Sequence, residues 1–389
     1  MATIALVQYT NQHEEVLAPQ IEMLKGFCRV EVFAPESIFE TDLLRALSSE
    51  YNKNKVYAPK HLLIKIIRRL VPFFFAWTCY KKIRNKAADL AVSCVIFNTI
   101  SSIYELCLIV FLFRKIPTIH IIHNMQHYAH MPRKHFLSYF KKNLFISKDV
   151  FDHTIRHCIR EEEVHRYDHF LPILFDSFLS RKGTVGTIGG YTGKYSINTE
   201  LINIGIVGSV DMKRRNYRCA VESVKKANSS AGRCLYRIYI ISRISSRVRN
   251  YIYKSGMYDS FVYFNDHIPY AEMFHLIKRI DLLAFMADRS VKNNKYYNTY
   301  KITGTSVLAK AFKKPCISSD EFRIDGSLRD KTLFYHADRF DEVLRKINAG
   351  EITKNTIKEL AEKFSAEGSF DQTFQKERYL SIIRSCISD

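Results

Sequence analysis

Short apolar runs alternate with stretches of helical periodicity along this 389-residue chain. The alternating series occurs twice, once in each half. Runs of Val, Ile and Phe without polar alternation are typical of strands that are buried on both faces of a parallel sheet, with helices covering those faces. The expected strands fall at residues 4–8, 30–33, 90–97, 118–123 and 143–147, and then at 203–207, 236–241, 261–264, 282–286 and 315–318. The pattern predicts an α/β chain of two doubly wound, Rossmann-like domains.

A glycine-rich stretch separates the two halves. Residues 183–193 contain five glycines with Thr among them, which is typical of a flexible connection. The pair Gly193-Lys194 does not form a phosphate-binding P-loop. Ile188 and Tyr195 stand where that motif needs Gly and Ser or Thr.

This break predicts three parts: an amino-terminal domain at 1–180, a linker at 181–197 and a carboxy-terminal domain at 198–389. The terminal helices, from Phe340 onward, can pack back on the first domain. Two doubly wound domains predict a ligand site in the cleft between them, at the carboxyl ends of the strands.

Basic residues greatly outnumber acidic ones. The chain has 59 Lys and Arg against 39 Asp and Glu, a formal net charge of +20. Such an excess favours an anionic partner, which can be a nucleic acid, a phospholipid surface or a phosphorylated substrate. Charge alone does not choose among them, and solvated surface lysines are the plain alternative.

Two apolar stretches invite comparison with membrane-spanning helices. The stretch 62–80 is interrupted by basic residues and is rich in aromatic ones: Lys65, Arg68, Arg69, Phe73, Phe74, Phe75 and Trp77. The stretch 103–113 contains Glu105 and is far shorter than the ~20 residues of a span. We expect the second to be a buried core helix. The first fits either a surface segment that lies on a bilayer or a core-packing helix.

The amino terminus and the cysteines predict a cytoplasmic protein. Met1 leads directly into an expected strand, without the basic region and long apolar region of a secretory signal. The nine cysteines are scattered and include no Cys-x-x-Cys pair, a pattern typical of reduced thiols.

The loop after the first strand of the second half combines a glycine with basic residues. Gly208 and Ser209 follow the strand, and Lys213, Arg214 and Arg215 precede a helix. Glycine permits close approach of the backbone, and a helix start offers free N–H groups and a positive dipole end. Such a place suits a diphosphate that leaves with extra negative charge. A basic helix terminus facing water is the alternative.

A second cluster begins another helix. Lys301 is followed by Thr303, Gly304 and Thr305. Backbone N–H groups and hydroxyls at a helix start can hold phosphate or sugar oxygens. An ordinary Thr N-cap is the alternative.

Among the histidines, His123 ends an expected strand and would open into the cleft. A histidine there can hydrogen-bond a sugar hydroxyl or transfer a proton near neutral pH, although a loop histidine without a role is the alternative. His153 and His157 have the helical spacing of zinc ligands, but no cysteine or carboxylate pattern completes a site. We therefore expect no metal.

These motifs together resemble the GT-B-fold glycosyltransferases, in particular the retaining glycosyltransferase family 4, which includes many polysaccharide-building enzymes. The likeness extends over nearly the whole chain as a pattern. The segments that carry it are 204–213, 262–273, 281–285 and 309–315 in the second half, and 116–124 and 143–147 in the first.

The resemblance implies a metal-independent glycosyltransferase without a cofactor, which transfers a sugar from a nucleotide-sugar donor to a glycan or polyprenyl-linked acceptor in surface polysaccharide biosynthesis. It implies catalytic roles for His123 and Lys213 and a peripheral position on the inner membrane face, through the segment near 62–80. The donor-binding residues that it implies are Gly208, Ser209, Arg214, His267, Ile268, Lys301, Thr303, Gly304 and Thr305.

The chain departs from the family at several positions. Tyr300 and Leu308 stand where the family has two glutamates eight positions apart, and Ser209 replaces the arginine of its first phosphate loop. Residues 9–12 replace a glycine-rich acceptor loop. The donor, the acceptor and the stereochemical outcome are left open.

Three other functions compete with the transferase. A GT-B-fold sugar-nucleotide epimerase would need paired carboxylates, which the sequence does not show. A nucleic-acid-binding protein would fit the charge, but no recognised motif accompanies it. A transferase-like scaffold without activity would fit the missing glutamates.

Overall fold

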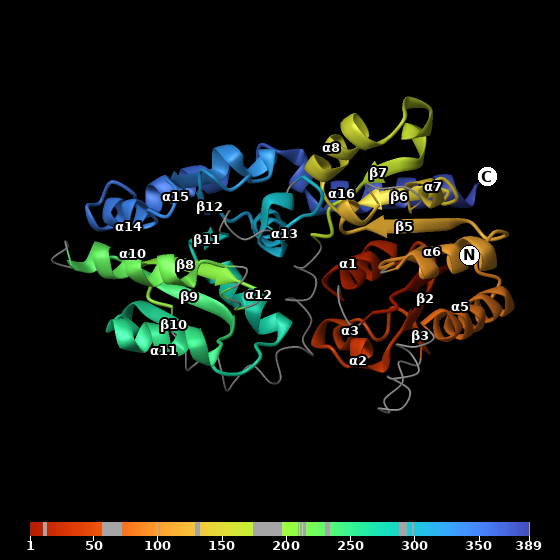
Figure 1. The fold of residues 1–389 in the computed structure, drawn as a ribbon, viewed down its shortest axis with the longest axis horizontal. Coiled ribbons are helices and arrows are strands. Elements are labelled where there is room, and N and C mark those ends of the chain that lie inside the picture. Colours follow the sequence, from red (N-terminus) through yellow and green to blue (C-terminus); the bar gives the residue numbers. More distant parts are fainter. Residues whose placement is uncertain are drawn as a thin grey trace. The chain divides into compact units, whose positions relative to one another are not determined.

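The computed structural model describes residues 1–389 except 11–13, 57–71, 101, 129–132, 174–196, 209, 211, 213–214, 230–233, 288–293, 298 and 389. The chain divides into two compact units, one of Met1–Ser177 with Gln372–Asp389 and one of Phe178–Asp371 (Figure 1). Each unit is a parallel sheet with alternating helices, which confirms the predicted two-domain α/β, Rossmann-like fold. The predicted linker lies outside the described residues except for Ile197.

The first unit is built on a seven-stranded parallel sheet with the order β3-β2-β1-β4-β5-β6-β7. Its strands are β1 (Thr3–Val7), β2 (Arg29–Ala34), β3 (Asn52–Lys55), β4 (Cys94–Phe97), β5 (Thr118–Ile122), β6 (Lys142–Phe145) and β7 (Tyr167–His169). The strand order reverses between β1 and β4, so the crossover helices cover both faces of the sheet.

Helices of the first unit begin where the sequence offers caps. The Ser102 hydroxyl accepts a hydrogen bond from the backbone N–H of Glu105, and the Ser147 hydroxyl accepts one from that of Val150. The helices are α1 (Glu14–Leu24), α2 (Glu36–Phe39), α3 (Asp42–Ala46), α5 (Pro72–Asp89), α6 (Ile103–Leu112), α7 (Arg133–Leu137), α8 (Lys148–Cys158) and α16 (Gln372–Ile387).

The last helix, α16, belongs to the first unit, where it packs on α1. The Gln375 side chain accepts a hydrogen bond from the Leu171 backbone at 2.8 Å, and Arg378 forms an ion pair with Asp168. These contacts fasten the end of the chain beside β7.

The second unit has a six-stranded parallel sheet with the order β10-β9-β8-β11-β12-β13. Its strands are β8 (Ile202–Val207), β9 (Tyr236–Arg243), β10 (Phe261–Phe264), β11 (Leu282–Ala284), β12 (Cys316–Ser319) and β13 (Thr332–Tyr335). Its helices are α10 (Tyr217–Ser229), α11 (Ser246–Ser255), α12 (Tyr270–Arg279), α13 (Gly304–Ala311), α14 (Asp341–Asn348) and α15 (Lys354–Glu362). Here the order reverses between β8 and β11.

Several elements differ from the sequence prediction. The expected strand at 90–97 begins only at Cys94, because α5 extends to Asp89 and Ala91 then turns the chain with a φ of 49°. The helix at 103–113 exists and buries Leu106 and Ile109, but it exposes Tyr104 and Phe111 on its other face. Within the described residues, no helix combines the length and the apolar character needed to cross a bilayer.

Candidate functional site

The point at which the strand order reverses marks the ligand crevice of a doubly wound sheet, because the loops on either side of it run apart. In the second unit this point lies between the carboxyl ends of β8 and β11. Gly208 follows β8, and Phe285, Met286 and Ala287 follow β11. The candidate site of this unit is built from these two loops.

Arg215 joins the two loops. Its Nη1 donates a hydrogen bond to the Phe285 carbonyl oxygen at 3.3 Å, and its backbone forms an antiparallel bridge with Ala287. Next to it, the Asn216 backbone N–H donates to the Met286 carbonyl at 2.9 Å. The start of α10 is therefore fastened to the loop after β11.

The Arg215 guanidinium also lies directly against Gly208. Gly208 has a φ of +100°, and a Cβ on it would lie 2.8 Å from Nη2 of Arg215. Met286, across the crevice, is a non-glycine residue with a φ of 42° and is buried. Strained backbone of this kind persists where the surrounding structure enforces it, and it is concentrated at functional sites.

We expect Gly208→Ala to destabilise the second unit and to displace Arg215. The new methyl group would meet the guanidinium, and the left-handed backbone costs an L-residue about 1–2 kcal/mol. Gly256→Ala is the matched control, since Gly256 has a φ of +75° with open space around it. The Arg215 side chain can move aside but would then give up its hydrogen bond to Phe285, so the loss of unfolding free energy in urea should be larger for Gly208→Ala by about 0.5–1.5 kcal/mol. Equal losses would show that the contact with Arg215 is not tight.

Helix α13, which follows β11 in the chain, carries the second predicted cluster. The Thr303 hydroxyl accepts a hydrogen bond from the Ser306 backbone at 3.0 Å and shares another with the Ser306 hydroxyl at 2.9 Å. Thr303 is thus the N-cap of α13. Gly304 is exposed, whereas Thr305 is buried, so a ligand at this helix end would meet backbone N–H groups and not the Thr305 hydroxyl. Lys301 lies before the helix, with Nζ 4.2 Å from the centre of the Tyr297 ring.

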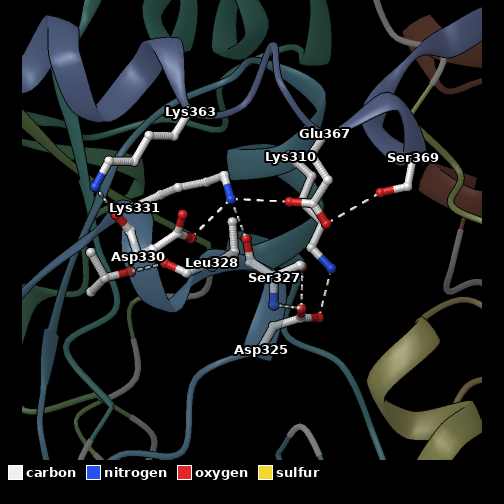
Figure 2. A network of polar contacts seen from close by, with 10 residues as sticks. Lys310, Asp325, Ser327, Leu328, Asp330, Lys331, Lys363, Glu367 and Ser369 are labelled. Atoms are coloured by element: carbon white, nitrogen blue, oxygen red, sulfur yellow. Dashed lines mark hydrogen bonds and ion pairs between the residues drawn. The ribbon is translucent and has the colours of Figure 1, made fainter.

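An ion pair buried in the second unit anchors α13 (Figure 2). Lys310 Nζ lies 2.6 Å from Asp325 Oδ2, and both side chains are almost completely buried. Ser327 donates a hydrogen bond to the same carboxylate through its backbone N–H. Farther along, Lys331 Nζ lies 3.0 Å from Glu367 Oε2. The network holds the helix whose first residues form the predicted phosphate cluster.

The other predicted residues are placed less closely around the crevice. His267 is exposed and Ile268 buried, in the loop after the edge strand β10, two strands from β8. Ser209, Lys213 and Arg214 lie outside the described residues. Their proposed roles stay predictions.

A polar layer lies at the carboxyl edge of the first sheet. Gln8, after β1, donates a hydrogen bond through Nε2 to the Thr99 hydroxyl after β4 at 3.0 Å. On β5, His120 Nε2 lies 3.2 Å from the Tyr128 hydroxyl, which donates to the Ile100 carbonyl. His120 and the Tyr128 hydroxyl thus share a hydrogen bond, in which the tautomer of the imidazole ring decides which group donates.

His120 and the predicted His123 stand in different environments. Burial lowers the pKa of His120 to about 3, with a smaller opposing effect from Asn143, so His120 is neutral at physiological pH. His123 follows β5 and is only half-buried. His153 and His157 have ring centres 4.6 Å apart on α8, yet among the described residues no three His, Cys, Asp or Glu side chains form a metal-binding group.

Comparison with known proteins finds solved structures that share this architecture. No protein-family model matches the chain, and no curated protein sequence is detectably similar. Solved structures are similar over their whole length. A glycosyltransferase from Rickettsia africae has a TM-score of 0.69 at 13% identity, covering 100% of this chain and 99% of its own. The Anabaena protein HepE, in complex with UDP, has a TM-score of 0.62 at 11% identity, covering 99% and 100%.

The chain has the GT-B fold. A UDP-GlcNAc 2-epimerase from Methanocaldococcus jannaschii also shares it, with a TM-score of 0.60 at 12% identity, covering 98% of this chain and 99% of its own. The same fold therefore carries different reactions on sugar nucleotides, and the likeness establishes the fold alone. Membership of family 4 stays a prediction.

Proposed function

We propose that the chain is a glycosyltransferase that takes its sugar from a nucleotide donor held in the second unit. The observation that carries the proposal is the reversal of strand order between β8 and β11, where Arg215 lies against Gly208 and donates a hydrogen bond to the loop after β11. A guanidinium has five N–H donors in a planar fork, so Arg215 can hold Phe285 and still present donors to a diphosphate. HepE and a Neisseria meningitidis epimerase were solved with UDP and UDP-GlcNAc, and we propose UDP as the nucleotide to test first.

The proposed mechanism is electrostatic stabilisation of the departing diphosphate. As the bond between sugar and diphosphate breaks, negative charge grows on the departing phosphate oxygens. Arg215, with the predicted Lys213 and Arg214, would stabilise that charge, and the exposed backbone at the start of α13 would add N–H donors. No metal is required for this role. The predicted part of His123 is to orient the acceptor or accept its proton.

We also propose a glycan or polyprenyl-linked acceptor, surface polysaccharide as the product, and a cytoplasmic location at the inner membrane face. The polyprenyl acceptor would require the enzyme to work at a membrane surface. Residues 62–71 of the predicted contact segment lie outside the described residues, and residues 72–80 form the first half of α5.

Product analysis distinguishes transferase from epimerase. The protein would be incubated with each member of a UDP-sugar panel, with and without glycan and polyprenyl-phosphate acceptors, and the products followed by NMR. Release of UDP that depends on an acceptor supports the proposal. Conversion of UDP-GlcNAc into its C2 epimer without acceptor would replace it with the epimerase reaction.

A further inference from the structure

The strand order of the first sheet reverses between β1 and β4, and these two strands end side by side at its carboxyl edge. The Asn98 backbone N–H, directly after β4, donates to the Val7 carbonyl oxygen of β1 at 2.9 Å. Loops that run apart at such a reversal leave room for a ligand. The residues directly after β1 and β4 therefore hold the position in this unit that the loops after β8 and β11 hold in the second unit.

The Asn98 side chain lies at this reversal with its hydrogen-bonding capacity unused. Asn98 is completely buried, and in the described part of the chain neither its amide nitrogen nor its carbonyl oxygen has a hydrogen-bond partner. Buried polar groups are rarely left in this state unless a water or a ligand completes them. A carboxamide offers both donors and an acceptor, and a hydroxyl group on a ligand can satisfy both kinds of atom. Asn98 therefore favours a ligand rich in hydroxyls, such as a sugar.

A carboxylate lies in the helix that follows β4. Glu105 belongs to the first turn of α6, and only 6% of its surface is exposed. The other buried carboxylate among the described residues of the first unit is Glu31, which accepts hydrogen bonds from Asn52 and Asn54 and so holds β3 to β2. Glu31 thus has a structural role, whereas Glu105 lies near the reversal of strand order.

Tyrosine side chains place Glu105 in the layer of residues at this edge of the sheet. Tyr80, from α5, is completely buried, and its ring centre lies 5.3 Å from that of Tyr9, which follows β1. Burial raises the pKa of Tyr80 well above its usual value, and the Glu105 carboxylate is the next largest cause. Tyr128, after β5, contributes to the same shift, and its hydroxyl donates to the Ile100 carbonyl oxygen in the loop before α6. Glu105 therefore shares one buried layer with residues that follow β1, β4 and β5.

Within this layer Glu105 is better suited than its neighbours to take a proton from a bound hydroxyl. Glutamate is one of the side chains that act as general bases in enzymes. The raised pKa of Tyr80 keeps its hydroxyl protonated. Burial lowers the pKa of His120 to about 3, which makes it a weak base.

Starting from the proposed transferase function, on which this inference rests, we propose that Glu105 is the general base of the transfer and that Asn98 holds the acceptor hydroxyl. The acceptor group is then a sugar hydroxyl, which needs a base, and not a phosphate oxygen, which is already ionised. His123 keeps the role of orienting the acceptor.

The reaction is a single displacement. The acceptor O–H bond breaks, and its proton passes to the Glu105 carboxylate. The acceptor oxygen forms a bond to the anomeric carbon of the donor sugar, while the bond from that carbon to the diphosphate breaks and its electron pair leaves with UDP. Glu105 then releases the proton to water. Because the new bond forms on the face opposite the leaving group, the anomeric configuration is inverted.

The configuration of the product is the first test. The wild-type protein would be incubated with a panel of UDP-sugars and methyl hexosides, and the new linkage would be assigned by NMR. We expect inversion. Retention would contradict a single displacement and would leave the transferase function intact. A protein that forms no glycoside with any of these donors and acceptors would contradict the transferase function, and this inference with it.

Variants then test the two residues separately. Glu105→Gln should lower kcat at least about a hundredfold and leave the acceptor KM nearly unchanged, because a general base acts in the transition state. Glutamine suits the same position in the first turn of a helix, and an unchanged thermal shift with UDP would show that the fold and the donor site are intact. Asn98→Ala should instead raise the acceptor KM roughly two- to twelve-fold, the loss of one hydrogen bond. The control Glu15→Gln, in the first turn of α1 at the same edge of the sheet, should keep the wild-type kcat.

Other outcomes would overturn the inference. A kcat of Glu105→Gln within about tenfold of the wild type, or equal losses in Glu105→Gln and Glu15→Gln, would remove Glu105 from the proton transfer. A loss of kcat confined to His123→Gln would assign the proton to His123. Faster transfer to polyprenyl phosphate than to any methyl hexoside would exclude a hydroxyl acceptor. In each of these cases the wild type still transfers sugar, so the proposed function stands while this inference fails.

Discussion

Replacing Lys310 with methionine is expected to destabilise the second unit by about 3–5 kcal/mol. The substitution leaves the Asp325 carboxylate almost fully buried without the ammonium 2.6 Å away. Lys310 also lies 5.7 Å from the centre of the Phe370 ring, so its removal loosens contacts on two sides. Urea unfolding, with hydrogen exchange of the α13 amides, measures the loss.

A paired variant separates charge from packing. Lys310→Met with Asp325→Leu removes both charges and should recover most of the lost stability, because the cost arises from the uncompensated carboxylate. Lys254→Met, on the exposed face of α11, should change the unfolding free energy by less than about 0.5 kcal/mol. A Lys310→Met protein within 1 kcal/mol of the wild type would show that the pair is not buried as described.

The same pair has a defined pH dependence. Burial alone would raise the pKa of Asp325, but the Lys310 ammonium and hydrogen bonds from Lys310 and Ser327 outweigh it and hold the pKa below its usual range. The contribution of the carboxylate is therefore present above the unfolded pKa of about 3.9 and is lost as the pH falls below it.

As the pH falls, the first unit is expected to begin losing stability at a higher pH than the Lys310–Asp325 pair does, because burial lowers the pKa of two of its histidines. His120 has a pKa of about 3 in the folded protein, because burial disfavours its charged form, against about 6.5 in the unfolded chain. Between these values only the unfolded state takes up the proton. The contribution of His120 to the free energy of unfolding is therefore complete above pH 6.5 and falls by about 1.4 kcal/mol for each pH unit below it. His169, whose pKa burial and Arg378 lower to about 4, acts in the same direction.

Urea midpoints at pH 7.5, 6.0 and 5.0 test this expectation. His120→Gln keeps a hydrogen-bonding side chain for Tyr128 but does not titrate, so its stability should fall about half as steeply with pH as that of the wild type. The difference in unfolding free energy between His120→Gln and the wild type at pH 7.5 gives the cost of the substitution itself. An unchanged slope would mean that His120 is not the group that takes up the proton on unfolding.

The apolar strands could be predicted because burial on both faces leaves a mark that is local in the sequence. β1, β5 and β8 are buried nearly throughout and read as continuous apolar runs. β3 gave no such mark, since its sequence is Asn-Lys-Asn-Lys. It is fixed by pairing with β2 and by the amides of Asn52 and Asn54, which each donate to the Glu31 carboxylate at 2.8 Å. Contacts of that range are invisible to periodicity.

The residues of the candidate site were also predictable only in part, because local sequence patterns do not show contacts between distant residues. A glycine before basic residues directed attention to the loop after β8, but the sequence did not show that Arg215 contacts Gly208 and the Phe285 carbonyl. Lys213 and Arg214 lie outside the described residues, so their roles stay predictions. Nothing in the sequence near Lys310 indicates that it is buried, because its partner Asp325 lies fifteen residues farther along the chain. Thr303 proved to be an N-cap, which its position before a helix allowed from the start.

Nucleotide binding at the loops after β8 and β11 is the most direct test of the proposed donor site. The melting temperature would be measured with UDP for the wild type, Arg215→Ala and the control Arg218→Ala, whose guanidinium lies instead over the Tyr251 ring. At a hundred times its dissociation constant a nucleotide adds about 2.7 kcal/mol of stability, a shift of several degrees. We predict that shift in the wild type and in Arg218→Ala, and its loss in Arg215→Ala. No shift with UDP or any other nucleoside diphosphate, or a full shift in Arg215→Ala, would contradict a donor site built on this arginine.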